Sequence, residues 1–270
     1  MRSARRRASR GELARACVVA LCAQWVTACG GADAPPGCGG SDARNLLLLT
    51  IDTLRADHVS SYGYACPTSP HIDALAASGL RFAQATATRG ETWPSLVSLM
   101  TSTLPAVHGV LENGFAFDAR IPTLAEALRG CGYETAAFLT NMVSSPHPGF
   151  EHLDFYAQDG ADDAATAAAV AWLAGPRREP FFVWLHWIGP HAPYAPSGRY
   201  LAAFRDGDAG DVDTGLSTLR RIQTERRVLS EAELARIVSR YDGEIAQVDA
   251  HVGEVLAASA RAPRSGRSSC

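Results

Sequence analysis

The sequence contains no lysine, and all 25 residues counted as lysine or arginine are arginines. A reaction that needs a lysine amine is therefore excluded. The chain also lacks an excess of positive charge, and its formal net charge of -3 at pH 7 gives no electrostatic support for a nucleic-acid partner. No internal repeat is visible. The composition is 47% hydrophobic and 20% charged, and 270 residues fit a leader followed by one large α/β domain.

The N-terminal region has no hydrophobic run long enough to span a bilayer comfortably. Arginines at positions 2, 5, 6, 7, 10 and 15 precede a short apolar run at residues 16–26, which is typical of a signal peptide. The run ends in VTACGG, which resembles a bacterial lipobox with Cys29 as the lipidated first residue of the mature protein. The alternative is an ordinary secretory signal. We expect a signal peptide at 1–28, a flexible tether at 29–43, and an exported cell-envelope lipoprotein on the periplasmic or outer-membrane side.

Few cysteines remain once this leader is set aside. Cys38, Cys66, Cys131 and Cys270 lie beyond it, and their spacing fits no metal-site pattern. Four cysteines in an exported chain can pair, but the sequence leaves their pairing open.

Apolar runs alternate with helical patterns along the rest of the chain. This alternation predicts a doubly wound α/β sheet flanked by helices. We expect strands at 46–51, 134–140 and 181–187, with a further extended segment at 79–83. We expect helices at 70–78, 94–102, 122–129, 162–173 and 230–258, the last beginning with a capping box at SEAE. Residues 205–227 are polar and predict a surface excursion.

The first predicted strand ends on a carboxylate. The run 46–51 is apolar and bounded by polar residues, which predicts a fully buried, parallel strand, and Asp52 follows it directly. Ligands of open α/β sheets bind beyond the carboxyl ends of the strands, and a carboxylate there suits a hard cation. The alternative is that Asp52 only caps the following turn.

Two hydroxyls flank the start of a predicted helix in ETWPS. The backbone N–H groups at such a position form an anion site, so Thr92 or Ser95 could attack a phosphoryl or sulfuryl centre. The alternative is that either hydroxyl merely caps the helix.

Two histidines follow the strand predicted at 181–187. His186 is delivered by that strand, and His191 lies between prolines in HWIGPHAPYAP, an exposed and rigid setting that suits a general acid. A structural role for both is the alternative.

Taken in order, these stretches resemble the sulfatase family of the alkaline phosphatase-like superfamily. The resemblance begins with the apolar run followed by DTLRADH and YGY, and continues with PTSPHIDALAASGLRF and TWPSLVSLMTSTLPAVHGV. It extends through IPTLAEALRGCGYETAAFLTN, HWIGPHAPYAP and YDGEIAQVDAHVG, so it covers about residues 44 to 256. It implies an alkaline phosphatase-like α/β fold with a mixed, mostly parallel sheet in a domain at 44–259.

The resemblance also implies roles for particular residues. Asp52 would be a ligand of a divalent cation, usually calcium, and Thr92 would be both the nucleophile and a metal ligand. His191 would protonate the leaving group, and His186 and Asn141 would contact the substrate, a small-molecule or glycan sulfate ester or phosphoester.

Several positions depart from the family pattern. Thr53 stands where a second acidic residue is common, and Leu96 stands where the C/S-x-P-S-R motif has its arginine. Thr92 cannot become formylglycine, although related phosphoryl-transferring enzymes use threonine there. Asn141 fills part of the place of a lysine and a histidine. Residues 260–270, ARAPRSGRSSC, replace the family's further strand and D-H-G or D-N-G motif. We expect a C-terminally truncated domain with a disordered tail, weak metal binding and little turnover.

Three functions are compatible with this pattern. The first is metal-dependent hydrolysis of sulfate esters. The second is phosphoryl transfer of the phosphodiesterase or phosphoethanolamine-transferase type. The third is a lipoprotein that keeps the fold as a non-catalytic binding module.

Overall fold

The computed structural model describes residues 43–140, 148–157, 159–205 and 210–261. Contacts divide the chain into residues 1–41 and 42–270, and every described residue lies in the second unit. The predicted signal peptide and Cys29 lie outside the described residues, so export as a lipoprotein stays a prediction. Within the described residues, no helix is long and apolar enough to cross a membrane.

Four parallel strands form the centre of the fold. They are β1 (Leu46–Ile51), β2 (Glu134–Thr140), β3 (His152–Tyr156) and β4 (Phe181–Trp187), in the spatial order β1-β4-β2-β3. Each of the three strand pairs is parallel, with Leu46 opposite Phe182 and Glu134 opposite Phe181. Strands β1, β2 and β4 have the bounds predicted from the sequence. The described sheet is thus wholly parallel rather than mixed.

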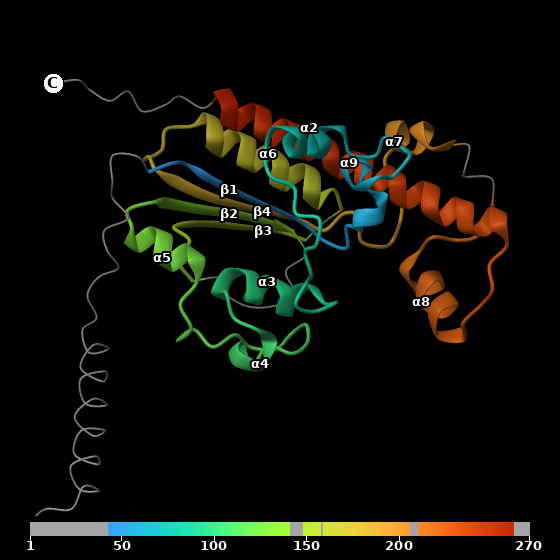
Figure 1. Ribbon diagram of the computed structural model, residues 1–270, viewed down its shortest axis with the longest axis horizontal. Helices are drawn as coiled ribbons and strands as arrows, with labels where there is room; N and C mark the ends of the chain where they lie inside the picture. Colours follow the sequence, from blue (N-terminus) through green and yellow to red (C-terminus); the bar gives the residue numbers. More distant parts are fainter. Residues whose placement is uncertain (1–42, 141–147, 158, 206–209, 262–270) are drawn as a thin grey trace, which may run out of the picture. The chain divides into compact units, whose positions relative to one another are not determined.

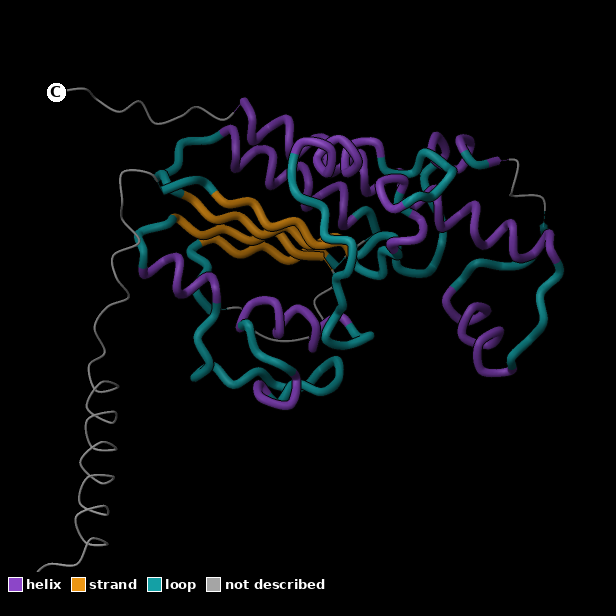
Figure 2. Tube along the Cα trace, viewed as in Figure 1, coloured by secondary structure: helices purple, strands orange, loops and turns teal. Residues whose placement is uncertain are grey.

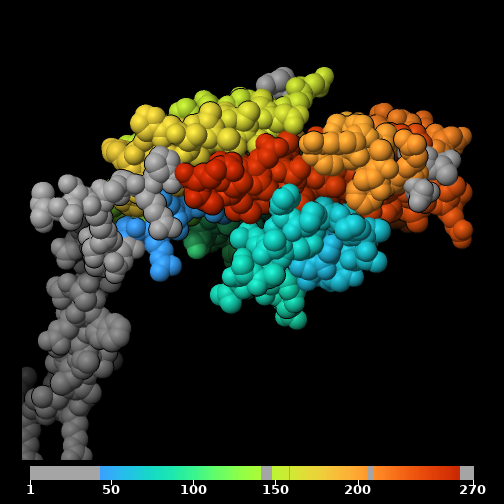
Figure 3. All heavy atoms as spheres, turned by 90° about the horizontal axis from the view of Figure 1, so that it is seen from above, coloured from blue at the N-terminus to red at the C-terminus, as the bar shows by residue number. Residues whose placement is uncertain are grey.

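Helices cover both faces of this sheet (Figure 1), as Figure 2 also shows. The face with α2, α6 and α9 is seen in Figure 3, where α9 lies between α6 and the segment that contains α2. Helices α3, α4 and α5 lie on the opposite side. The bounds are η2 (Ala56–His58), η3 (Ser60–Tyr62), α2 (Pro70–Ser78), α3 (Thr92–Thr101), α4 (Pro105–His108), α5 (Leu124–Gly130), α6 (Ala161–Ala174), α7 (Gly198–Ala203), α8 (Leu216–Glu225) and α9 (Glu231–Arg261).

Strand β4 is central, and all seven of its residues are buried. Successive side chains of a strand point to opposite faces, so its alternate residues supply two separate cores. Val183, Leu185 and Trp187 belong to the core beneath α6 and α9, whereas Phe182 and Trp184 belong to the core beneath α3 and α5. This double burial explains why FFVWLHW is apolar without alternation.

Several predictions about the elements were wrong. Strand β1 is only half-buried, because it pairs with β4 alone in the described sheet. The segment 79–83 forms no strand, and its Leu80 and Phe82 are exposed. The polar segment 205–227 contains helix α8, which was not predicted but has no buried residue, as expected of a surface excursion. Strand β3 and helices α4 and α7 were not predicted either. Helix α9 reaches Arg261, so the first two residues of the predicted disordered tail are helical.

Polar side chains in capping boxes determine where two of the helices begin. Helix α5 begins at Leu124, not at Pro122, because Thr123 and Glu126 form a capping box. Helix α9 has the predicted box as well: Ser230 Oγ accepts from the N–H of Glu233, whose carboxylate accepts from the N–H of Ser230.

Candidate active site

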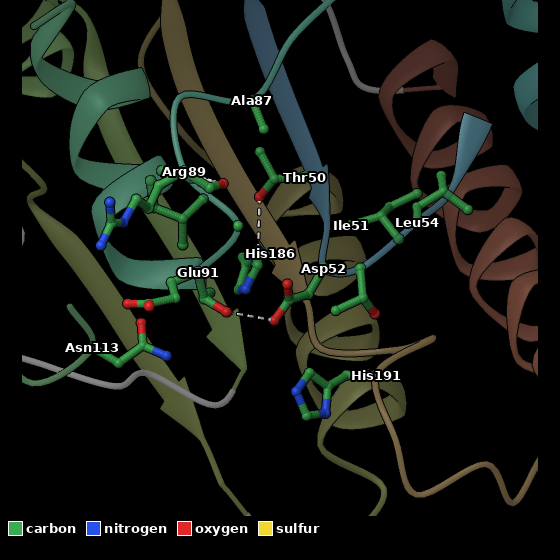
Figure 4. A pocket seen from close by; sticks show the side chains of 15 residues that line it. Thr50, Ile51, Asp52, Leu54, Ala87, Arg89, Glu91, Asn113, His186 and His191 are labelled. Carbon is green, nitrogen blue, oxygen red and sulfur yellow. Dashed lines mark hydrogen bonds between the residues drawn. The ribbon is translucent and has the colours of Figure 1, made fainter. Parts of the chain in front are cut away.

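A cavity of about 420 Å³ opens at the carboxyl ends of β1 and β4 (Figure 4). This volume lies within the range of small-molecule sites, about 300–1,000 Å³. The candidate site residues Asp52, Thr92, His186 and His191 line it together, and so does Ser95, the other candidate nucleophile. They come from two strand ends, the start of a helix and a loop that are distant in sequence. Asn141 lies outside the described residues.

Asp52 and Thr92 contact each other on the cavity wall. The Thr92 hydroxyl donates a hydrogen bond of 2.9 Å to Asp52 Oδ2. Thr92 is the first residue of α3, which has no side-chain cap, and Ser95 instead donates to the carbonyl oxygen of Arg89. The short helix η2, which follows β1, also begins without a side-chain cap. The side chains of Asp52 and Thr92 thus bond to each other, and the pair places a hydroxyl beside a carboxylate at a helix N-terminus.

The turn after Asp52 is held in an uncommon backbone conformation. Thr53 has a φ of 53°, which is rare for a β-branched residue. The hydroxyl of Tyr241 on α9 donates to the carbonyl oxygen of Thr53 and accepts from the N–H of Arg55. The backbone of Asp52 itself is tied to β4, through its N–H and the carbonyl oxygen of Trp187. These contacts fix the direction in which Asp52 leaves the strand.

His186 lies on β4 with its ring buried and its Nε2 turned toward the cavity (Figure 4). Its Nδ1 lies 3.0 Å from the hydroxyl of Thr50, and Nε2 is buried without a hydrogen-bond partner. Burial lowers the pKa of His186, while the carboxylates of Asp52 and Asp162 raise it less strongly. The imidazole is thus neutral at pH 7 and keeps one unpaired nitrogen for a group that enters the cavity.

His191 lines the same cavity from the loop after β4. Its Nδ1 lies 2.6 Å from the carbonyl oxygen of Ala192. A carbonyl oxygen only accepts, so Nδ1 carries the hydrogen. Nε2 is then the nitrogen that can hold or release a proton.

Three further lining residues carried no sequence signal. The amide oxygen of Asn113 accepts from the N–H of Trp93, the second residue of α3. Arg89 and Glu91 lie just before Thr92 and line the cavity as well, and one carboxylate oxygen of Glu91 is buried without a partner. Arg89 thus supplies a cation to the cavity, whereas Leu96 stands where the family motif has its arginine.

Side chains of helix α9 form hydrogen bonds with several of the stretches on which the family resemblance rests. Asp242 is buried and accepts from the hydroxyl of Tyr64 at 2.6 Å, and its other oxygen lies 2.7 Å from His58 Nδ1. Asp249, also buried, accepts from the N–H groups of His71 and Ile72 at the start of α2. His58, the YGY stretch and the start of α2 are therefore organised around the YDGEIAQVDAHVG stretch, whereas Asp52 at the start of DTLRADH lines the cavity.

Comparison with known proteins identifies the family. The family model described as Sulfatase matches residues 44–262. The chain belongs to the sulfatase family. It is therefore a member of a family of sulfuric ester hydrolases, with the alkaline phosphatase-like fold that the sequence predicted.

Curated relatives of this sulfatase-family chain act on different sulfate esters. N-acetylglucosamine-6-O-sulfatase of Bacteroides thetaiotaomicron is 25% identical over 186 residues, which are 60% of this chain and 33% of that protein. Arylsulfatase A of Bos taurus is 36% identical over 107 residues, 37% of this chain and 21% of that protein. The chain thus spans about a third or less of the length of these two relatives.

Solved structures share the fold. The phosphonate monoester hydrolase of Agrobacterium radiobacter has a TM-score of 0.67 at 20% identity, covering 80% of this chain and 59% of that one. A 2-O glycosaminoglycan sulfatase, BT1596, has a TM-score of 0.66 at 19% identity, covering 82% and 55%. At these identities the likeness concerns the fold alone.

Sulfatases generally depend on a divalent metal ion, and the donor set of this cavity tests whether one fits. Asp52 and Thr92 supply a carboxylate and a hydroxyl that contact each other, and Glu91 and Asn113 add oxygens elsewhere on the wall, whereas calcium takes about six to eight oxygen ligands. Among the described residues, no group of three or more His, Cys, Asp or Glu side chains could hold a metal ion. The described residues therefore do not fit a calcium ion by themselves.

Proposed function

We propose that this chain hydrolyses sulfate esters, with Thr92 as the nucleophile. The observation that carries the proposal is the 2.9 Å hydrogen bond from the Thr92 hydroxyl to Asp52 in a cavity that His186 and His191 also line. An alcohol is a weak nucleophile until a neighbouring base takes its proton. Asp52 accepts that hydrogen bond already and is placed to take the proton.

The reaction follows from these positions. Thr92 Oγ1 attacks sulfur, its proton passes to Asp52, and the bond between sulfur and the ester oxygen breaks. The leaving oxygen takes the proton from Nε2 of protonated His191, whose Nδ1 stays bonded to the carbonyl oxygen of Ala192. Water then cleaves the sulfate from Thr92: His191 takes a proton from the water, and Asp52 returns its proton to Thr92. A bound divalent ion would add charge stabilisation, and we propose that it would contact Asp52 and Thr92.

The substrate class that we propose is a sulfated sugar. One relative is named as an N-acetylglucosamine-6-O-sulfatase, and one solved structure with this fold is of BT4656 with D-glucosamine-2-N,6-O-disulfate. The cavity of about 420 Å³ can admit a single sugar ring, and Asn113 and Arg89 add polar groups to its wall. Asn141 would contact the substrate from the segment after β2.

Phosphoester hydrolysis is the second candidate. The nucleophile position holds a threonine, and the fold is shared with a phosphonate monoester hydrolase at a TM-score of 0.67. The same hydroxyl and acid would serve a phosphorus centre as well as a sulfur centre.

A substrate panel with two threonine variants tests the proposal. We expect the wild type to hydrolyse p-nitrophenyl sulfate or a 6-O-sulfated glucosamine faster than p-nitrophenyl phosphate, and Thr92→Ala to lower kcat by at least about 100-fold. Thr101→Ala is the matched control, because Thr101 lies on the same helix and bonds only to Val97 and Thr103. It should retain wild-type kcat.

The panel also separates the alternatives. Faster cleavage of phosphate esters would favour the second candidate. Equal rates for wild type and Thr92→Ala on all substrates would leave only a binding module and contradict both enzymatic functions.

A further inference from the structure

The loop at residues 188–197 carries His191 and has no regular secondary structure apart from turns. Its first two N–H groups donate to side chains from other elements. Asp162, in the first turn of α6, accepts from the N–H of Ile188 at 3.0 Å and from the N–H of Gly189 at 2.9 Å. The N–H of Ile188 is shared with the hydroxyl of Thr140, the last residue of β2, at 2.7 Å. Both oxygens of that carboxylate are therefore used to fix the start of the loop.

The far end of the loop is held in the same way from α9. Glu244 accepts from the N–H of Ala195 at 2.8 Å, and Gln247 accepts from the N–H of Ser197 at 2.9 Å. Since both lie on one rigid helix, one turn apart, they hold this end in register with α9. The position of His191 is thus set by α6 on one side and by α9 on the other.

The two carboxylates converge on Gly189. A Cβ at this glycine would lie 2.9 Å from Val248, 3.0 Å from Asp162 Oδ2 and 3.8 Å from Glu244 Oε2. Glycine is therefore needed for the loop to pass between them.

Among the described residues, no arginine or histidine forms an ion pair with Asp162 or Glu244. Burial raises the pKa of Glu244 from 4.5 to about 7. The hydrogen bond from Ala195 lowers this pKa, and the charge of Asp162 raises it by a smaller amount. Tyr194 also faces Glu244, is neutral in this range, and adds no charge.

We propose that Asp162 and Glu244 are positioning residues that fix the His191 loop over the cavity, and that Glu244 does so best when it is protonated. The proposal rests on the proposed function only in taking His191 as the acid. A protonated Glu244 keeps one oxygen as acceptor for Ala195 and leaves no charge buried, which outweighs the stronger hydrogen bond that an ionised carboxylate would accept from Ala195. We call the contacts of Asp162 and Glu244 with the loop the clamp. Because the pKa of Glu244 is higher in the folded loop than in a solvent-exposed glutamate, the clamp weakens as pH rises from about 4.5 to about 7.

Amide hydrogen exchange of the loop tests the clamp without any need for activity. We expect Glu244→Ala to speed exchange at Ala195 by about tenfold or more, because the N–H loses its acceptor. Glu244→Gln should preserve the protection, since the amide oxygen replaces the carboxylate oxygen. Glu254→Ala is the control, on an exposed position of the same helix, and should leave exchange at Ala195 unchanged.

The pH dependence supplies the second readout. In the wild type, protection at Ala195 should fall between about pH 5 and about pH 7 and level off above that, after correction for the intrinsic exchange rate, and in Glu244→Gln it should stay constant. If Glu244→Ala does not fold, this comparison still decides. Unchanged exchange in Glu244→Ala, or equal pH dependence in the wild type and Glu244→Gln, would overturn the proposal.

Rates of ester hydrolysis test whether the clamp affects catalysis. Glu244→Ala should lower kcat about tenfold with KM within about twofold, because a displaced acid affects the transition state more than binding, and Glu244→Gln should restore kcat. A wild type that hydrolyses no ester would defeat the proposed function, while the exchange data would still test the clamp. An active wild type with unchanged kcat in Glu244→Ala would refute positioning.

Discussion

The backbone at Thr53 is strained, directly beside Asp52, the candidate metal ligand and base. Its φ of 53° places a β-branched residue in the left-handed region, where such residues cost about 1–3 kcal/mol. The strain is maintained by Tyr241, which bonds the carbonyl oxygen of Thr53 from α9. Strain of this kind at a strand end fixes the direction of the next side chain, here Asp52, at the expense of stability.

Replacing Thr53 with a residue that tolerates this region should therefore stabilise the protein. We expect Thr53→Asn to raise the free energy of unfolding by about 1 kcal/mol, measured by urea denaturation. Thr224→Asn, at an exposed helical position of α8, should stay within about 0.5 kcal/mol of wild type. A destabilised Thr53→Asn beside an unchanged Thr224→Asn would show that the turn is not strained.

The residues of the site differ in how far the sequence could reveal them. Asp52 and His186 were predictable because each stands at the end of an apolar run that forms a strand. Glu244 was not, because one glutamate in an amphipathic helix has the same pattern whether it faces solvent or holds a loop about fifty residues away. The role of Asn113 depends likewise on a contact with the first turn of α3 that no spacing encodes.

At the scale of elements, α9 acts as the support to which the site segments are attached. Its Tyr241, Asp242, Glu244 and Asp249 each bond to a different segment: the turn after β1, the η2–Tyr64 region, the His191 loop and the start of α2. The hydrophobic period of this helix was visible in the sequence. Its second role was not, because polar residues on the border of the apolar face usually contact water.

Helix α2 depends on a side chain of α9 for the capping of its N-terminus. Its N-cap residue, Ser69, makes no side-chain cap bond, and the buried Asp249 of α9 accepts two of its first N–H groups at 2.9 Å each. We expect Asp249→Ala to cost about 2 kcal/mol, since it removes the acceptor of two N–H groups in the first turn of α2. For a domain of this size the melting temperature should fall by about 4–8 °C.

A control on the same helix separates capping from helix propensity. Glu254→Ala changes an exposed glutamate of α9 and should shift the melting temperature by no more than about 2 °C. Equal shifts for Asp249→Ala and Glu254→Ala would show that Asp249 does not cap α2.

For the whole molecule, the sequence predicted the α/β class and three of the four described strands with their bounds. All three strands form from apolar runs. Strands β2 and β4 are buried on both faces, and β1 is half-buried. Strand β3, HLDFY, lies at an edge of the described sheet and contains a charged residue. It therefore lacks the continuous apolar run from which the other strands were predicted. Half-burial of β1 has the same origin, since edge position depends on strand order and not on local composition.

The donor set of the described cavity leads to a prediction about calcium. Asp52 and Thr92 contact each other, but no group of three or more His, Cys, Asp or Glu side chains among the described residues could complete a shell, so we expect a dissociation constant in the millimolar range or weaker. Calcium at about 1 mM would then add no more than about 0.4 kcal/mol, and the melting temperature with calcium or with EDTA should agree within about 2 °C. Isothermal titration calorimetry checks the affinity directly, with Asp52→Asn as the comparison. A micromolar affinity that Asp52→Asn abolishes would mean that Asp52 binds the ion with donors beyond those described, and would contradict the prediction.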